Sequence, residues 1–490
     1  MRSRTTTDRL ATRLAVCLVT GLAAVAPAAW ANGLDGIFAV RGLEGLEVLE
    51  AENAERLFTP ASVQKLIVGA AVFHYLGPDY RVATHVATAG ELLPIEEGGY
   101  RLTGDLVVEG ACDPTWGRRH NPQDARAPLR QIARDLAALG LRRVEGDLVV
   151  DASRFPGRRY PDGWPEGDAA FSWGAAPSAL AIDENVVGVS VAAGGALGQP
   201  ARIDGAADVE WINQTVTVGR ERHGRGSLEF QPIWGQPRVV VRGEYPISEP
   251  AFGVRLASPD PEGRAGIALR QALERAGIEV LGEVRVAQRP PPGKLERLAT
   301  YTSPPVRDMV VVMLRNSHNF YAESLLRILA AARVGDGRLD RGLDLESEFL
   351  RYVVGIDRVD FELDDASGLS PFNLISPRAT VALLRWVYQQ PWRDAYLTAL
   401  ASGSGGTLVG WGRLPPMVGK TGTIRHTQAL AGVLTPADGV PVFFAVFLNH
   451  RTQSRPQLRG EIVRALWRWH RGTAAPGLSS ALAAPTGVER

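Results

Sequence analysis

Apolar residues follow one another almost without interruption from Ser62 to Tyr75, and Gly77-Pro78 comes directly after them. A helix that is apolar on every side is buried, and glycine followed by proline ends a helix. Two short segments before it, Ile37 to Arg41 and Leu46 to Glu50, are strand-like and flank two glycines. The pattern therefore predicts a β-hairpin followed by a buried helix that begins at Ser62.

The middle of the chain has short apolar runs of the length of strands. Gly104-Asp105-Leu106-Val107-Val108-Glu109 recurs almost unchanged as Gly146-Asp147-Leu148-Val149-Val150-Asp151, with a helical pattern over 129–139 between them. Residues 186–256 alternate between apolar and polar positions and predict β structure. Three further segments are expected next: a helix over 263–276, a strand over 279–286 and the proline-rich linker 289–293.

Helical periodicity returns after this linker, and strand-like apolar runs follow it. The helices are expected over 306–315, 320–331, 377–389 and 461–470, and the strands over 417–424, 429–434 and 440–448. The last of these strands is almost wholly apolar, so we expect it to be buried. The pattern thus places helices and apolar strands near both chain ends, around a β-rich middle section.

The first 31 residues have the composition of an export signal. Four arginines precede an apolar run from Leu14 to about Ala26, and the small-residue pattern Ala29-Trp30-Ala31 follows. These parts predict a secretory signal peptide (1–31) and a periplasmic protein. No later run reaches the ~20 apolar residues of a membrane-spanning helix, so no transmembrane segment is expected in the mature chain. The tail 473–490, rich in Ala, Pro, Gly and Ser, is expected to be flexible.

Charge and cysteine content exclude several classes of function. Loss of the signal peptide would take the formal charge from +1 to −2, which leaves no excess positive charge for nucleic acid. It would also leave Cys112 as the single cysteine, so neither an internal disulfide nor a thiolate zinc site is expected. The eight histidines show no metal-binding spacing. We therefore expect no metal, no cofactor and no nucleic-acid partner.

Lysine is rare in this chain, which has three lysines against 51 arginines. Arginine is permanently protonated, whereas a buried lysine loses its proton readily, so lysine is retained where arginine cannot replace it. Lys65 lies in Ser62-Val63-Gln64-Lys65, and Lys420 lies in Lys420-Thr421-Gly422-Thr423. Lys294 follows the proline run and has no expected chemistry. Codon bias is the competing explanation for the low number.

Ser62 and Lys65 are three residues apart on the predicted helix, so their side chains are neighbours. A serine hydroxyl becomes a nucleophile when a base takes its proton, and a desolvated Lys65 is suited to that role. Backbone N–H groups without partners gather at a helix start and favour negative charge on a nearby oxygen. The Ser-x-x-Lys pattern alone is a weak indication, because it also arises by chance.

Two further motifs offer groups that such a serine would need. Ser317-His318-Asn319 comes directly before a predicted helix, where a hydroxyl could relay a proton and an amide could hold a substrate carbonyl or Lys65. An ordinary helix cap is the alternative. In the predicted strand 417–424, Gly422 would let substrate backbone lie alongside, and its neighbours offer a charge and two hydroxyls for a carboxylate. A basic turn is the alternative there.

The ordered set Ser-x-x-Lys, Ser-x-Asn and Lys-Thr-Gly is found in penicillin-binding proteins and serine β-lactamases. Lys65 and Ser317 are 252 residues apart, far more than a compact β-lactamase needs. The chain resembles the low-molecular-mass class C penicillin-binding proteins, which are D-alanyl-D-alanine carboxypeptidase/endopeptidases. Other segments extend the resemblance over nearly all of the mature chain: Phe58-Thr59-Pro60-Ala61, Gly104 to Gly110 with Asp113-Pro114, Gly146 to Val149 with Ser153-Arg154-Phe155, Tyr321 to Leu325, and Ser367-Gly368-Leu369-Ser370.

The resemblance implies an α/β fold, in which a transpeptidase/β-lactamase-like domain with an antiparallel sheet flanked by helices carries two nested, β-rich inserted domains. The implied boundaries are 32–86 and 297–472 for the catalytic domain, 87–176 and 253–296 for the first inserted domain, and 177–252 for the second.

The resemblance further implies a serine peptidase that acts on peptidoglycan stem peptides. It would cleave D-Ala-D-Ala and could also cleave D-Ala-diamino acid cross-links. β-Lactams would acylate the same enzyme. The implied catalytic residues are Ser62 as nucleophile, Lys65 as base, Ser317 as proton relay, Asn319 and Lys420. Lys420 and Thr421 would hold the terminal carboxylate beside Gly422, and the N–H groups of Ser62 and Thr423 would form the oxyanion hole.

The chain departs from the family pattern at two positions. His318 stands where similar proteins have Asn or Asp, and we expect its side chain to point away from the cleft. Pro371 follows Ser370, where similar enzymes often carry an arginine that binds a carboxylate of the diamino acid. We expect Arg425 to replace that arginine. Asp168, in a segment that resembles the family's, is expected to meet the amino group of the same diamino acid.

Two other functions stay open at this point. A β-lactamase would need a deacylating glutamate near the second motif, and no glutamate after Ser317 has a recognisable context. A non-catalytic wall-binding protein with the same fold is disfavoured by the intact Ser62, Lys65 and Lys420. The change at Pro371 keeps that reading open.

Overall fold

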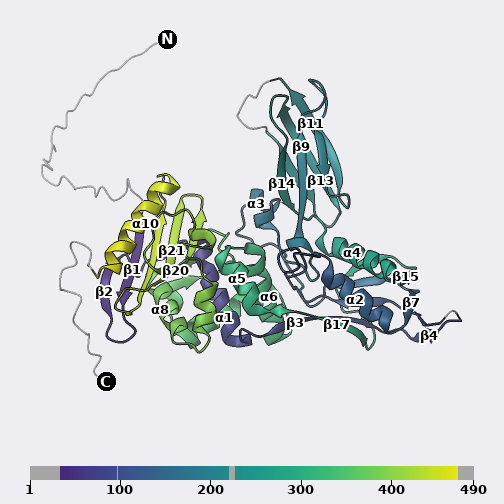
Figure 1. Ribbon diagram of the computed structural model, residues 1–490, viewed down its shortest axis with the longest axis horizontal. Helices are drawn as coiled ribbons and strands as arrows, with labels where there is room; N and C mark the ends of the chain where they lie inside the picture. Colours follow the sequence, from purple (N-terminus) through teal and green to yellow (C-terminus); the bar gives the residue numbers. More distant parts are fainter. Residues whose placement is uncertain (1–33, 97, 220–226, 473–490) are drawn as a thin grey trace, which may run out of the picture.

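The computed structural model describes residues 34–96, 98–219 and 227–472. The predicted signal peptide and the predicted flexible tail lie outside these residues. Figure 1 shows an elongated molecule: a domain built from both chain ends lies at the left, a second lies at the right, and a β domain projects upward from the second.

The left-hand domain contains a five-stranded antiparallel sheet in the order β2-β1-β22-β21-β20. Its strands are β1 (Leu34–Arg41), β2 (Glu47–Glu52), β20 (Met417–Ile424), β21 (Thr427–Leu434) and β22 (Val442–Asn449). The predicted hairpin and the three predicted C-terminal strands are confirmed, with small differences at their ends. β20 is the edge strand, so one side of its backbone is not paired within the sheet.

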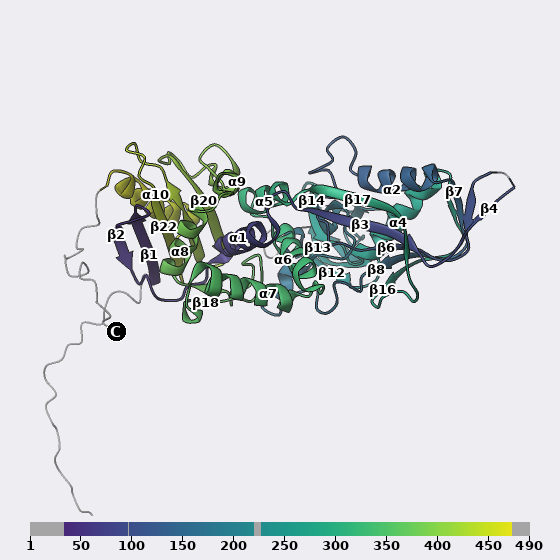
Figure 2. The same cartoon turned by 90° about the horizontal axis from the view of Figure 1, so that it is seen from below.

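Helices cover both faces of this sheet, and the alternation of side chains along β22 shows it. Phe443 and Phe447 pack into the core on the side of α8, while Phe444 and Val446 pack on the side of α10. The helices of the domain are α1 (Lys65–Leu76), α5 (Val306–Arg315), α6 (Asn319–Val334), α7 (Leu339–Glu348), α8 (Pro377–Tyr388), α9 (Arg393–Ala399) and α10 (Arg455–His470). Figure 2 shows the same layers from below.

The helix predicted to begin at Ser62 is buried as expected, but its α-helical part begins at Lys65. A short 3-10 helix, η2 (Ala61–Gln64), precedes it and carries Ser62. Ala61 has a left-handed backbone conformation with φ 48°, so the chain turns sharply just before the serine. The predicted C-terminal helix also begins earlier than expected, at Arg455, where Ser454 and Gln457 form a capping box.

The first inserted domain has a five-stranded sheet, β16-β8-β6-β3-β17, and a four-stranded sheet, β15-β7-β5-β4, together with α2 (Ala127–Ala138) and α4 (Pro261–Arg275). Its strands are β3 (Arg81–Thr88), β4 (Leu92–Pro94), β5 (Tyr100–Leu102), β6 (Leu106–Glu109), β7 (Leu141–Val144), β8 (Leu148–Asp151), β15 (Glu279–Val280), β16 (Val284–Ala287) and β17 (Glu296–Pro305). The repeated sequence forms the neighbouring parallel strands β6 and β8. The single strand predicted over 279–286 is wrong: β15 pairs with β7 in one sheet, and β16 pairs with β8 in the other.

The second inserted domain consists of two three-stranded sheets, β10-β9-β14 and β11-β13-β12, as the alternating pattern predicted. Its strands are β9 (Val186–Ala192), β10 (Arg202–Gly205), β11 (Glu210–Val218), β12 (Glu229–Ile233), β13 (Arg238–Pro246) and β14 (Phe252–Ala257). The two sheets share one apolar core.

Strand pairing refines the predicted domain boundaries. β3 and β17 pair with each other, and β3 pairs with β6, so both belong to a sheet of the first inserted domain. β14 pairs with β9 of the second inserted domain. We therefore propose that the boundaries lie before Arg81, after Pro305 and after Ala257, where the chain leaves these sheets.

Candidate active site

Lys65 is the first residue of α1 and Ser62 lies on the 3-10 helix η2 just before it, and their side chains are neighbours as their spacing predicted. Lys65 Nζ donates hydrogen bonds to Ser62 Oγ and to Asn319 Oδ1, both at 2.8 Å. Its third acceptor is the backbone carbonyl oxygen of Ser367. Lys65 is fully buried, so three protein acceptors replace the water that would otherwise surround its amine.

The surroundings of Lys65 favour the neutral amine. Burial lowers the pKa of Lys65 to about 7, even though the carboxylates of Asp365 and Glu323 act in the opposite direction. The usual pKa of a lysine is about 10.4. Near neutral pH this amine can therefore accept a proton from the serine hydroxyl 2.8 Å away.

The second motif lies in the turn between α5 and α6. Ser317 has φ 59°, a left-handed conformation that allows the chain to reverse between the two helices. Ser317 Oγ accepts a hydrogen bond from Lys420 Nζ at 2.8 Å. Asn319 accepts from Lys65 and donates through Nδ2 to the carbonyl of Trp173 at 2.8 Å. No side chain of the motif caps α6, so the helix-cap alternative is wrong.

The third motif lies on the edge strand β20, so the basic-turn alternative is also wrong. A Cβ atom on Gly422 would lie 2.4 Å from the carbonyl oxygen of Pro60. The structure therefore adds a second reason for a glycine here: β20 lies directly against the turn that carries the nucleophile. Lys420 is fully buried, and its Nζ also donates to the carbonyl of Thr421 at 2.7 Å.

The outer edge of β20 leaves backbone donors available. Gly419 exchanges two backbone hydrogen bonds with Ala401, on the side away from β21. Because backbone groups alternate in direction along a strand, the N–H groups of Thr421 and Thr423 point to that same side. The hydroxyl of Thr421 donates to Thr407 Oγ1 at 2.7 Å, and that of Thr423 accepts from Gln428 at 3.1 Å.

Burial lowers the pKa of Lys420 well below its usual value, and the positive charge of Lys65 lowers it further. The structure thus brings Ser62, Lys65 and Asn319 into one hydrogen-bonded group and Ser317 and Lys420 into a second. The two groups lie close enough for their lysines to interact electrostatically.

The two expected binding residues for a diamino acid are less closely connected to these groups. Asp168, on the short helix α3 (Glu166–Ala169), accepts from Trp173 Nε1 at 2.9 Å. The backbone carbonyl of Trp173 in turn accepts a hydrogen bond from Asn319, so Trp173 connects Asp168 to the second motif. Arg425 directly follows β20, is exposed and makes no hydrogen bond or ion pair with the described residues.

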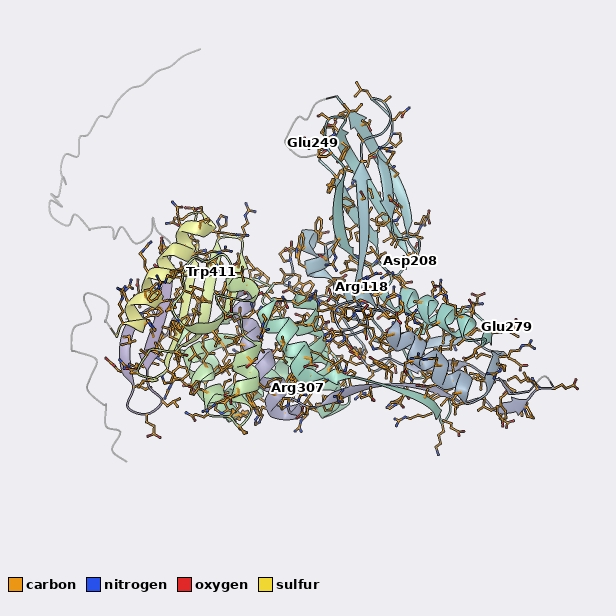
Figure 3. The ribbon with its side chains drawn as sticks, in the orientation of Figure 1. Arg118, Asp208, Glu249, Glu279, Arg307 and Trp411 are labelled. Carbon is orange, nitrogen blue, oxygen red and sulfur yellow. The ribbon has the colours of Figure 1, made fainter. Side chains whose placement is uncertain are left out.

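His318 does not contact Lys65 or Lys420. Its Nε2 lies 3.0 Å from Glu184 Oε2, near the junction of the two inserted domains. A cavity of about 370 Å³ at this junction is lined by Glu184, Tyr321 and the arginines Arg118, Arg119 and Arg255. Figure 3 labels Arg118 at this position. His318, which departs from the family pattern, thus connects the second motif to the inserted domains through Glu184.

Several residues of the site were not singled out from the sequence. The carbonyls of Ser367 and Trp173 and the carboxylates of Asp365 and Glu323 all contact the motif residues or the groups that hold them. Ser367 and Glu323 lie in segments that carry the family resemblance, so a signal was present. Asp365 and Trp173 had none.

Within the described residues, no group of three or more His, Cys, Asp or Glu side chains could hold a metal ion. None of the helices in the same part of the chain combines the length and the apolar character that crossing a membrane requires. Burial raises the pKa of the Cys112 thiol to about 12, so this cysteine is not a reactive thiolate.

Comparison with known proteins agrees with the geometry. The pattern of the family described as D-Ala-D-Ala carboxypeptidase 3 (S13) matches residues 32–468. The D-alanyl-D-alanine carboxypeptidase of Actinomadura sp. strain R39 is 31% identical over 411 residues, which are 80% of this chain and 73% of that protein. The D-alanyl-D-alanine carboxypeptidase DacB of Haemophilus influenzae is 27% identical over 412 residues, 81% of each chain.

A solved structure has the same fold. Penicillin-binding protein 4 of Haemophilus influenzae superposes with a TM-score of 0.78 at 24% identity, over 89% of this chain and 96% of that chain. A second structure of that protein holds a β-lactam and superposes with a TM-score of 0.75. At this identity the likeness establishes the fold, a transpeptidase-like domain with inserted domains. Together with the family match, it shows that the chain belongs to the D-Ala-D-Ala carboxypeptidase 3 (S13) family and is a low-molecular-mass class C penicillin-binding protein.

Proposed function

We propose that this protein is a serine-type D-Ala-D-Ala peptidase that acts on peptidoglycan stem peptides outside the cytoplasm and forms an acyl-enzyme on Ser62. One observation carries the proposal: a fully buried lysine, Lys65, lies 2.8 Å from the serine hydroxyl, and burial lowers its pKa to about 7. An amine with this pKa accepts a proton near neutral pH, which an arginine cannot do.

In the first half of the reaction, Ser62 Oγ attacks the carbonyl carbon of the bond between the two D-alanines. Lys65 Nζ takes the hydroxyl proton, a C–O bond forms, and the C–N bond to the terminal D-alanine then breaks. The leaving amine needs one proton. Ser317 would relay to it the proton that Lys65 took from Ser62. Ser317 Oγ accepts a hydrogen bond from Lys420 Nζ at 2.8 Å, so its own hydroxyl proton is available for transfer.

In the second half, water attacks the ester carbon and the bond to Ser62 Oγ breaks. The serine recovers its proton, and the shortened peptide leaves with a new carboxylate. β-Lactams would acylate the same serine, because their ring amide occupies the place of the peptide bond.

The negative oxygen that forms in each step would be bound by the backbone N–H groups of Ser62 and Thr423. Ser62 lies in the first turn of a helical segment, where N–H groups have no partner within the helix. The N–H of Thr423 points to the open edge of β20, as the pairing of Gly419 with Ala401 indicates. One such donor contributes about 3–4 kcal/mol to barrier lowering.

Thr421, Thr423 and Asn319 would bind the substrate beside β20, with Lys420 near its terminal carboxylate. Arg425 and Asp168 have opposite charges and are proposed to bind the carboxylate and the amino group of a diamino acid. Arg425 is suited to this because no described residue already pairs with it. Binding of a diamino acid would let the enzyme cleave cross-links as an endopeptidase.

The main test is to incubate the protein with labelled penicillin and with a muropeptide mixture, alongside its Ser62→Ala variant. We expect a long-lived adduct and release of D-alanine, both absent in the variant. Rapid hydrolysis of penicillin would instead indicate a β-lactamase. Neither adduct nor release would indicate a wall-binding protein without activity and would overturn the proposal.

The role of Arg425 has its own test. Arg425→Ala should slow cleavage of cross-linked muropeptides while leaving the penicillin adduct rate nearly unchanged, because penicillin lacks the diamino acid. Arg275→Ala is the matched control, since Arg275 is also outside any hydrogen bond or ion pair of the described residues but lies on α4 in the first inserted domain. Unchanged cross-link cleavage in Arg425→Ala would contradict the assignment.

A further inference from the structure

The loop behind Lys65 is built around one buried carboxylate. Asp365 is fully buried and forms no ion pair with a described residue. Six donors surround it instead, at 2.6–3.0 Å: the N–H groups of Gly368, Leu369 and Ser370, the hydroxyl of Ser367, the amide of Asn373 and the indole of Trp164. A buried carboxylate without a cation is retained only where such donors compensate its charge.

This loop provides the third acceptor of Lys65. The carbonyl oxygen of Ser367 accepts from Lys65 Nζ and lies 3.4 Å from Ser62 Oγ. The hydroxyl of the same residue and the next three backbone N–H groups all donate to Asp365. The Ser367 carbonyl therefore cannot turn away from Lys65 without breaking several bonds to Asp365.

One of the six donors comes from a different domain. Trp164 belongs to the first inserted domain, is buried, and donates from Nε1 to Asp365 Oδ2 at 2.7 Å. The segment around it lies directly on the loop. A Cβ atom on Gly163 would lie 2.1 Å from Ser370 Oγ and 2.3 Å from Asp364 Oδ2. Only a glycine allows so close an approach between the two domains.

The loop's remaining support comes from the catalytic domain itself. Glu323 on α6 accepts from the N–H groups of Ala366 and Ser367 at 3.0 and 3.1 Å. Trp164 is thus the single donor to Asp365 that lies outside the catalytic domain, among the hydrogen bonds of the described residues. It is also the one donor whose position depends on how the inserted domain docks.

We propose that Asp365 is a positioning residue for Lys65, a role that rests on the function proposed above. Trp164 is then the residue through which the inserted domain holds the Ser367 loop in its catalytic position. We call this pair the Trp164–Asp365 brace. The inserted domain then contributes to the chemistry at Ser62, in addition to any contact that it makes with substrate.

The brace makes two predictions of opposite sign for the proton on Lys65. Removal of the indole N–H leaves the negative charge of Asp365 less compensated, so Lys65 should hold its proton to higher pH. Asp365→Asn removes that charge, so Lys65 should lose its proton at lower pH, because the carboxylate raises the pKa of Lys65. A purely structural role predicts neither shift.

The low lysine content makes a direct measurement possible. With 13C-labelled lysine, the protein should give three Cε signals, which Lys→Arg variants assign. Lys294 is exposed and serves as internal reference. In Trp164→Phe we expect the Lys65 midpoint to rise by a few tenths of a pH unit, and penicillin acylation to slow about tenfold, the effect of one lost hydrogen bond to a charged group.

Trp116→Phe is the matched control. Trp116 Nε1 donates to Asp113 Oδ2 at 3.0 Å, and both residues are buried within the first inserted domain. This variant should lose thermal stability without moving the Lys65 signal. An unshifted Lys65 midpoint in Trp164→Phe, or an equal shift in Trp116→Phe, would overturn the brace.

The lysine spectrum does not depend on activity. Failure of the wild-type protein to form an adduct would count against the proposed function, whereas an unchanged Lys65 midpoint in Trp164→Phe counts against the brace. Asp365→Asn provides the second variant: a Lys65 midpoint that does not fall there would also contradict the positioning role.

Discussion

Lys65 and Lys420 are both fully buried in one site, yet different groups surround them. Lys65, on α1, has three hydrogen-bond acceptors, and the carboxylates of Asp365 and Glu323 act on it from behind the Ser367 loop. Lys420, on β20, has two acceptors, the hydroxyl of Ser317 and the carbonyl of Thr421. The one charged group with a marked effect on Lys420 is Lys65 itself.

The difference shows how two buried lysines can take different roles. Burial lowers the pKa of both, but the carboxylates hold that of Lys65 at about 7, where it can both accept and release a proton. Lys420 has no such compensation, so burial and the positive charge of Lys65 hold its pKa well below the usual value. A substrate carboxylate beside Thr421 would favour its protonation. We therefore expect substrate binding to raise the pKa of Lys420.

The largest effect is expected for Lys65→Arg. A guanidinium stays protonated and cannot act as base, and general-base catalysis contributes about 10²–10⁴-fold. Penicillin acylation of Ser62 should therefore slow by roughly 10³-fold or more. The measurement is the second-order rate of adduct formation, with the circular dichroism spectrum as a check that the variant is folded. A rate within tenfold of wild type would show that Lys65 is not the base.

Lys420→Arg should have a smaller but still large effect, on the order of 10²-fold in acylation. Lys420 does not touch Ser62; it acts through Ser317, 2.8 Å away. Ser317→Ala should lower the rate to a similar extent, and the double variant should be little worse than either single one, because the two groups act together. A loss larger than that of Lys65→Arg would reverse the roles assigned to the two lysines.

A third expectation concerns pH. Acylation by the wild-type protein should rise with pH through about 7 and then level off, because Lys65 must be neutral to take the serine proton. Glu323→Gln removes one of the two carboxylates that raise the pKa of Lys65, so the midpoint should move to lower pH. Glutamine keeps the acceptor oxygen for the N–H groups of Ala366 and Ser367.

Glu262→Gln is the control for this shift. Glu262 is also buried and, like Glu323, pairs with an arginine, but its partner Arg159 lies in the first inserted domain and Glu262 does not act on Lys65. Its replacement should leave the pH profile in place. An unchanged midpoint in Glu323→Gln would mean that the carboxylate is not charged when Lys65 titrates, and the contrast between the two lysines would lose its electrostatic basis.

The sequence was sufficient for the parts of this site that depend on local spacing. Three residues along a helical turn bring Lys65 to Ser62, and apolar runs predicted β21 and β22. The backbone of β20 was expected as a strand with the same bounds. Even here the helix start was misplaced, because the sharp turn at Ala61 puts Ser62 on a 3-10 helix rather than on α1.

The remainder depends on contacts between distant parts of the chain. The bond from Trp164 to Asp365 joins residues 201 positions apart in different domains, and no periodicity encodes it. A second reason for Gly422 was not expected from the sequence for the same cause: the obstacle to a side chain is the carbonyl of Pro60, which only the folded chain brings close. The pairing of β3 with β17 and β6 likewise joins distant segments, and it is the basis of the domain boundaries that we propose before Arg81 and after Pro305.

The smallest effect is expected for Lys294→Arg. Lys294 is exposed and makes no hydrogen bond or ion pair with the described residues, so its exchange should change stability by less than about 0.5 kcal/mol. Acylation rate and melting temperature should equal those of the wild type. Because this variant adds no charge and removes none, it isolates lysine identity from lysine chemistry. A loss of acylation in this variant would mean that an exposed lysine far from Ser62 and Ser317 is also needed. It would then be wrong that burial beside these serines distinguishes the functional lysines of this chain.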